Sequence, residues 1–84
     1  MKKIKVLVVD DSMLFRKVLI DSLSKHSDIE VIGFAVDAFD AKEKIPVLCP
    51  DVVTLDVEMP RLNGIAFLKQ LIPQHPVPVV VVSS

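Results

Sequence analysis

The stretch Ile4-Lys5-Val6-Leu7-Val8-Val9-Asp10-Asp11-Ser12 decides the fold class, because it joins an apolar strand to an acidic turn. Residues 4–9 are almost entirely apolar towards their end, which is typical of strands buried on both faces of a parallel sheet. Ser12 is a favourable N-cap for a helix predicted over residues 13–25. The apolar stripe of that helix consists of Phe15, Val18, Leu19 and Leu23.

The same alternation continues along the chain. Residues 29–35 and 52–55 read as further buried strands, the latter ending at Asp56, and residues 77–82 read as a fourth. Asp37 or Asp40 is expected to cap a second helix, which Pro46 should end or kink near Ile45. Residues 58–63 form a predicted loop. A third helical stripe follows it, made of Ile65, Leu68, Leu71 and Ile72.

The predicted order βαβαβαβ favours one doubly wound parallel sheet. Crossovers between parallel strands are almost always right-handed. If the first crossover moves in one direction along the sheet and the next two move in the other, the strand order becomes 2-1-3-4. The first helix then lies on one face and the second and third on the other. Ligands of such sheets bind at the carboxyl ends of the strands that flank the switch point, here strands one and three.

Composition limits the function classes. The 84 residues allow a single domain over 1–84, with 51% hydrophobic and 25% charged residues. A net charge of −1 argues against a nucleic-acid or membrane-surface binder. The single Cys49 excludes an intramolecular disulfide, fits a reducing compartment and is expected to be at least half-buried. The four phenylalanines are expected in the core, and no stretch resembles a signal peptide or membrane span, so the default is a soluble cytoplasmic protein.

Three carboxylates are predicted to converge at the switch point. Asp10 and Asp11 follow the first strand, and Asp56 ends the third. Clustered like charges need a counter-ion, and an all-oxygen site suits Mg²⁺. A carboxylate can also accept a phosphoryl group as a nucleophile, so these parts amount to a phosphoryl-transfer site. The hydroxyl of Ser83, at the end of the fourth strand, could hydrogen-bond that group.

Motifs for competing functions are absent from the sequence. It contains no phosphate-binding G-x-x-x-x-G-K-[ST], no G-x-G-x-x-G and no G-x-S-x-G elbow, since its only glycines are Gly33 and Gly64. A carboxylate-nucleophile phosphatase fits less well than a phosphoacceptor, because Asp10 and Asp11 are adjacent and lack D-x-D spacing. His26 and His75 are expected at the surface.

Two segments resemble the receiver domains of bacterial two-component response regulators: Val8-Val9-Asp10-Asp11-Ser12 and residues 55–64, LDVEMPRLNG. The likeness spans the whole chain. Thr54 to Pro60 and Val82-Ser83-Ser84 are more similar still to the N-terminal receiver of chemotaxis protein-glutamate methylesterases. The resemblance implies a flavodoxin-like fold.

The resemblance also implies a role for each matching residue. Asp56 would be the phosphoacceptor and Ser83 the switch hydroxyl. Asp11, Asp56 and the backbone carbonyl of Glu58 would bind Mg²⁺, with Asp10 supporting the site. The implied partners are a chemotaxis histidine kinase, which donates from phosphohistidine, and a C-terminal methylesterase or other output domain.

The sequence departs from the family pattern after Ser84. Receiver domains have a fifth strand with a lysine that pairs with the phosphoryl group, and neither that strand nor any methylesterase residue is present here. The chain therefore reads as the first part of a receiver. A stand-alone or degenerate receiver, acting as a phosphorylation-independent interaction module, is the alternative function. The exposed fourth strand would favour a marginal monomer or a dimer formed through that strand.

Overall fold

The computed structural model describes residues 2–56 and 76–82. Within them the order is β1 (Ile4–Val9), α1 (Met13–Ser24), β2 (Ile29–Ala35), α2 (Ala38–Leu48), β3 (Val52–Asp56) and β4 (Val79–Val82). The predicted strands at residues 4–9 and 29–35 are confirmed residue for residue. The predicted loop over 58–63 and the third helix lie outside the described residues.

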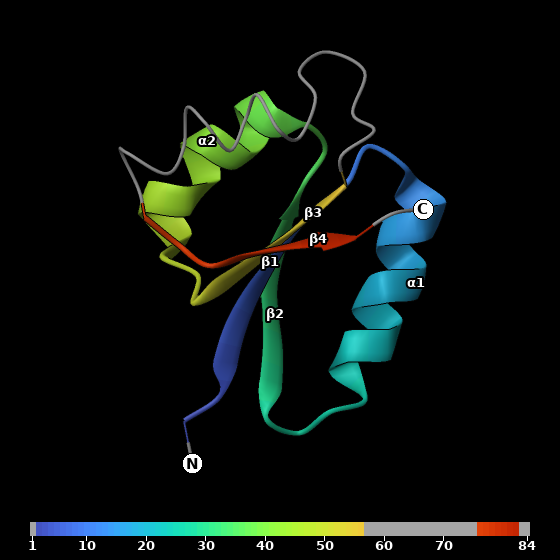
Figure 1. Cartoon of the computed structure of the whole chain (residues 1–84). Coiled ribbons are helices and arrows are strands. Elements are labelled where there is room, and N and C mark those ends of the chain that lie inside the picture. Colours follow the sequence, from blue (N-terminus) through green and yellow to red (C-terminus); the bar gives the residue numbers. More distant parts are fainter. Residues whose placement is uncertain (1, 57–75, 83–84) are drawn as a thin grey trace.

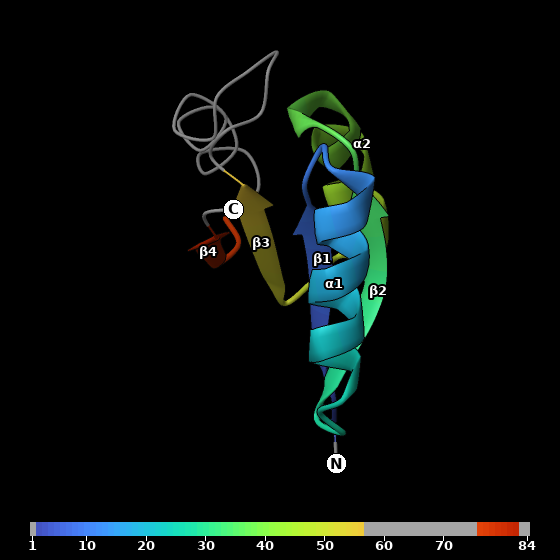
Figure 2. The same cartoon turned by 90° about the vertical axis from the view of Figure 1, so that its right-hand side faces the viewer.

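The strands form one parallel sheet in the order β2-β1-β3-β4, which confirms the predicted 2-1-3-4 topology. Figures 1 and 2 show α1 on one face of this sheet and α2 on the other. Because β1 and β3 are parallel neighbours, their carboxyl ends lie side by side at the point where the strand order reverses. The fold is the flavodoxin-like doubly wound arrangement.

The core lies between the sheet and α2. Its buried side chains come from β1, β3, the end of β2 and the inner face of α2: Leu7, Val9, Val53, Leu55, Ala35, Ala38, Ala41 and Ile45. The stripe residues Phe15, Leu19 and Leu23 of α1 are only half-buried, and no residue of α1 is fully buried. The two faces of the sheet are therefore covered unequally.

Two of the phenylalanines contradict the predicted core. Phe34 is 44% exposed and Phe39 is 54% exposed. Phe34 belongs to β2, which is at the edge of the sheet, and its ring lies beside charged side chains. Phe39 lies in the first turn of α2, whose buried positions are Ala38, Ala41 and Ile45. Phe67 lies outside the described residues.

Helix capping agrees with the predictions from the sequence, whereas the effect of Pro46 on α2 does not. The Ser12 side chain accepts a hydrogen bond from the Phe15 amide at 3.2 Å, and that of Asp37 accepts one from the Asp40 amide at 2.8 Å. Of the two expected effects of Pro46, an end or a kink of the helix near Ile45, the end is wrong, since α2 continues to Leu48. Pro46 occupies the last turn, where its missing N–H removes a single helix hydrogen bond.

Smaller details of the structure can also be compared with the predictions. Cys49 is exposed, not half-buried, because it takes a left-handed conformation (φ 51°) as the C-cap of α2. Strand β4 begins at Val79 instead of Val77, although Val77 still packs against the core. His26 is exposed as expected. None of the described helices is both long enough and apolar enough to span a membrane.

Candidate acidic site

The site forms where β1 and β3 end. Asp10 directly follows the last residue of β1, and Asp56 is the last residue of β3. Asp10 is 1% exposed and Asp56 is 3% exposed, whereas Asp11 is open to solvent. Parallel pairing of β1 with β3 brings the two buried carboxylates to the same edge of the sheet.

The three predicted carboxylates do converge. Each of Asp10, Asp11 and Asp56 offers a carboxylate oxygen, and these oxygens all lie within 4.8 Å of one another. This confirms the geometric part of the prediction. The predicted roles of the Glu58 carbonyl and the Ser83 hydroxyl, like the position of His75, lie outside the described residues.

Asp10 is held through its backbone and its side chain. Its amide donates to the Ala35 carbonyl at 3.0 Å, which ties it to the end of β2. Its Oδ1 accepts a hydrogen bond from the Ser12 amide at 2.8 Å. Its backbone carbonyl accepts one from Nη1 of Arg16, also at 2.8 Å. The turn between β1 and α1 is therefore locked at both of its ends.

Burial raises the pKa of Asp10 above its ordinary value of 3.8. The hydrogen bond from the Ser12 amide opposes this shift, the negative charges of Asp56 and Asp11 add to it, and the positive charge of Arg16 opposes it. A buried carboxylate among other carboxylates is destabilised in its charged form unless a cation joins it. The set consists of two buried carboxylates and one exposed carboxylate, and all of its ligand atoms are oxygens. Such a set fits a hard divalent cation such as Mg²⁺.

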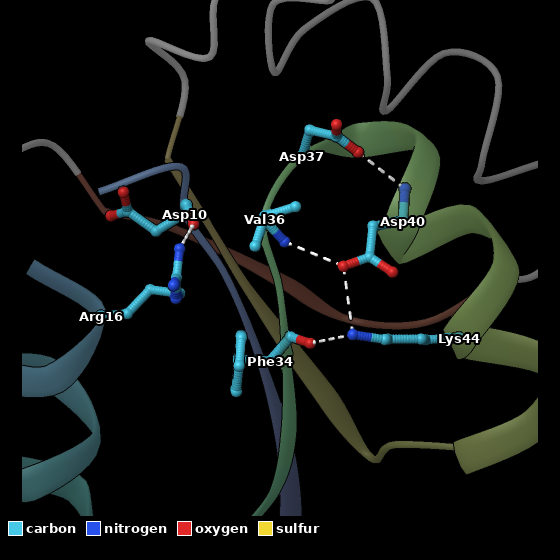
Figure 3. A network of polar contacts seen from close by, with 7 residues as sticks. All are labelled: Asp10, Arg16, Phe34, Val36, Asp37, Asp40 and Lys44. Atoms are coloured by element: carbon cyan, nitrogen blue, oxygen red, sulfur yellow. Dashed lines mark hydrogen bonds and ion pairs between the residues drawn. The ribbon is translucent and has the colours of Figure 1, made fainter. Parts of the chain in front are cut away.

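Arg16, Phe34 and Lys44 form a network beside this site that sequence reasoning missed (Figure 3). The Arg16 guanidinium lies over the Phe34 ring, 4.7 Å from its centroid, and the Lys44 ammonium lies 5.2 Å from that centroid. Arg16 lies off the apolar stripe that the sequence predicted for α1. Its position four residues after the N-cap Ser12 gave no sign that it reaches the Asp10 carbonyl.

Lys44 connects the network to the start of α2. Its ammonium donates to the Phe34 carbonyl at 2.7 Å and to Oδ2 of Asp40 at 3.1 Å, and that oxygen also accepts from the Val36 amide. Burial alone would raise the pKa of Asp40. The Val36 amide, Lys44 and Arg16 outweigh it and lower that pKa below its ordinary value. Side chains of α2 thus satisfy the carbonyl of Phe34, in β2, and the amide of Val36, which follows β2.

A separate open groove of about 270 Å³ lies between α1 and the edge strand β2. It is lined by Met13, Arg16, Lys17, Ile20, Asp21 and Phe34. None of the three clustered aspartates lines this groove, so the groove and the acidic site are distinct, although Arg16 contacts both.

Comparison with known proteins identifies relatives across the whole chain. A family model described as the response regulator receiver domain matches residues 6–84. A protein-glutamate methylesterase/protein-glutamine glutaminase from Syntrophus aciditrophicus is 57% identical over 84 residues, and one from Geobacillus kaustophilus is 60% identical over 84 residues. The chain covers 100% of its own length but only 24% of each of these relatives.

Solved structures agree with the sequence relatives. The response regulator domain of Thermotoga maritima CheB superposes with a TM-score of 0.92 at 49% identity, covering 99% of this chain and 62% of that one. A signal receiver domain of a response regulator named NarL from Mycobacterium tuberculosis superposes with a TM-score of 0.90 at 33% identity. Fold and sequence thus point to the same family.

Proposed function

The chain belongs to the response regulator receiver domain family, and from this membership we propose that it is a phosphoacceptor module of a chemotaxis-type two-component system. Asp56 receives a phosphoryl group from the phosphohistidine of a histidine kinase, with Mg²⁺ as the required cation. The single observation that carries the proposal is the approach of three carboxylates, from the ends of β1 and β3, to within 4.8 Å of one another.

In this proposal each of the three carboxylates has a role, and Asp56 has two. A carboxylate oxygen of Asp56 forms a bond to phosphorus while the phosphorus–nitrogen bond of the donor phosphohistidine breaks, and the released imidazole takes up a proton. Asp11 and Asp56, with the backbone carbonyl of Glu58, would hold the ion, and Asp10 would support them. Bound Mg²⁺ supplies neutralisation of the negative charge on the transferred phosphoryl oxygens.

The proposed output follows from the relatives. The chain spans about a quarter of the length of the curated methylesterases that it matches. We infer that residues 1–84 are receiver sequence of a longer cytoplasmic protein, in which phosphorylation of Asp56 regulates a methylesterase domain. The hydroxyl of Ser83 is the proposed switch group that senses the phosphoryl group.

The test is the intact mass of the natural full-length protein after incubation with Mg²⁺ and a small acyl phosphate. The wild type is expected to gain the mass of one phosphoryl group, and chelation of Mg²⁺ should prevent this gain. Asp56→Asn should remove the labelling. Asp28→Asn, which neutralises an exposed carboxylate in the turn before β2, is the matched control and should label normally.

Equal labelling of the wild type and Asp56→Asn would refute the assignment of the phosphoacceptor. A wild type that neither labels nor binds Mg²⁺ would favour the alternative of a phosphorylation-independent interaction module.

A further inference from the structure

Arg16 contacts the acidic turn through the backbone carbonyl of Asp10. Its Nη1 donates to the carbonyl oxygen of Asp10 at 2.8 Å, while its guanidinium carbon lies over the Phe34 ring, 4.7 Å from the ring centroid (Figure 3). Arg16 is half-buried, so this bond is partly shielded from competing water. A charge-assisted hydrogen bond of this kind is roughly twice as strong as a neutral one.

The contact constrains Asp11, the one exposed carboxylate of the cluster. The Asp10 carbonyl belongs to the peptide unit that supplies the Asp11 amide nitrogen, and Arg16 holds that unit. The Ser12 amide belongs to the next peptide unit, and Oδ1 of Asp10 holds it at 2.8 Å. Both peptide planes that flank Asp11 are therefore fixed, and the direction of its Cα–Cβ bond is fixed with them.

Phe34 makes the support specific for arginine. A flat guanidinium can lie on an aromatic ring and still donate in its own plane, whereas an ammonium has no plane to stack. The Phe34 residue is itself anchored, because Lys44 donates to its carbonyl at 2.7 Å. Helix α2 thus supports the hydrogen bond from Arg16 to Asp10 indirectly, through its contact with Phe34 in β2.

We propose that Arg16 is a positioning residue for the acidic metal site, which sets the direction of the Asp11 carboxylate by clamping the Asp10 carbonyl against the Phe34 platform. This inference rests on the proposed function, because it assigns Arg16 a role in Mg²⁺ binding there.

Arg16 could act by positioning Asp11 or only as a positive charge, and these two roles predict opposite changes in Mg²⁺ affinity when Arg16 is removed. A nearby cation repels Mg²⁺, so if Arg16 acted only as a charge, its removal would strengthen Mg²⁺ binding. If Arg16 positions Asp11, its removal weakens binding in spite of the relieved repulsion. Loss of an outer partner of a metal ligand typically costs about tenfold or more in metal affinity.

The experiment is calorimetric titration of the natural full-length protein with Mg²⁺, using Arg16→Met, Arg16→Lys and the control Lys17→Met. Lys17 is the exposed neighbour on α1, so its substitution removes the same charge without the clamp. Both Arg16 variants are expected to bind Mg²⁺ about tenfold more weakly, while Lys17→Met stays close to the wild type. Tighter binding by Arg16→Met, together with unchanged binding by Arg16→Lys, would overturn the proposal.

A second measurement separates this inference from the proposed function. In metal-free protein, hydrogen exchange of the Ser12 amide should be faster in both Arg16 variants than in Lys17→Met. Unchanged exchange overturns the positioning role. If the wild type fails to bind Mg²⁺, that result refutes only the metal site of the proposed function. If Arg16→Met does not fold, Arg16→Lys carries the same test, because it keeps the charge and most of the side-chain length.

Discussion

At the scale of single residues, Asp10 is a buried carboxylate that lowers the stability of the folded protein when it is charged. Its carboxylate is almost fully buried, and burial is the largest of the effects that raise its pKa. The folded protein therefore binds a proton at Asp10 more tightly than the unfolded chain does. Stability consequently falls as pH rises from the ordinary aspartate value through the raised pKa of the folded state.

Asp10→Asn is accordingly expected to raise the melting temperature of the metal-free protein at neutral pH. Asparagine keeps an oxygen that can accept the Ser12 amide bond but does not titrate, so it removes the repulsion from Asp11 and Asp56. Thermal unfolding in the presence of a chelator, measured over a pH series, checks this expectation. The control Asp28→Asn should melt at the same temperature as the wild type. An Asp10→Asn variant that melts below the wild type at neutral pH would contradict the expectation.

At the scale of elements, α2 depends on its N-terminal cap. Asp37 has extended backbone angles and accepts the Asp40 amide at 2.8 Å, which satisfies one of the free donors in the first turn. The same turn carries Asp40 and leads to Lys44, the anchor of Phe34. The start of α2 therefore supports both its own helix and the edge of the sheet.

Asp37→Ala is expected to lower the free energy of unfolding by about 1 kcal/mol, because it leaves the Asp40 amide without its acceptor. Denaturant unfolding with an unchanged slope measures this difference. Asp37→Ser keeps a capping oxygen and should recover most of the lost stability. Equal stability of the alanine and serine variants would show that the cap contributes nothing.

At the scale of the whole molecule, the two faces of the sheet differ in how they are covered. The α2 face carries the buried core, whereas α1 exposes Met13, Leu14 and Val18 by 76%, 74% and 55%. Among the described residues β4 pairs only with β3, and its Val80 and Val81 are 52% and 50% exposed. An apolar strand with a free edge is a template for pairing with another chain.

The 84-residue chain produced on its own is therefore expected to dimerise through β4. Val80→Lys should shift it towards the monomer, because charge on an edge strand disfavours pairing. Val18→Lys adds the same charge on α1 and should leave the dimer intact. Sedimentation or light scattering over a concentration series measures this. A monodisperse wild-type monomer with a cooperative thermal transition would refute the prediction.

Local sequence patterns determined where most of the described strands and helix caps of this protein lie. Strand β1, strand β2 and the caps Ser12 and Asp37 follow from apolar runs and capping side chains, which act over a few residues. The meeting of the three aspartates was also predicted from the sequence, given a first crossover in one direction along the sheet and the next two in the other, and the structure confirms that strand order. Each of these features depends on neighbours along the chain or on the topology.

Only the tertiary structure decided the features that depend on contacts between distant segments. Helix α2 continues past Pro46 because Ile45 is buried and Leu48 packs against the core, which offsets the lost hydrogen bond. Phe34 became a platform for Arg16 and not a core residue because β2 is at the edge of the sheet. The Arg16 clamp on Asp10 spans only six residues, but the Phe34 ring beneath Arg16 comes from β2, and no local pattern encodes that contact.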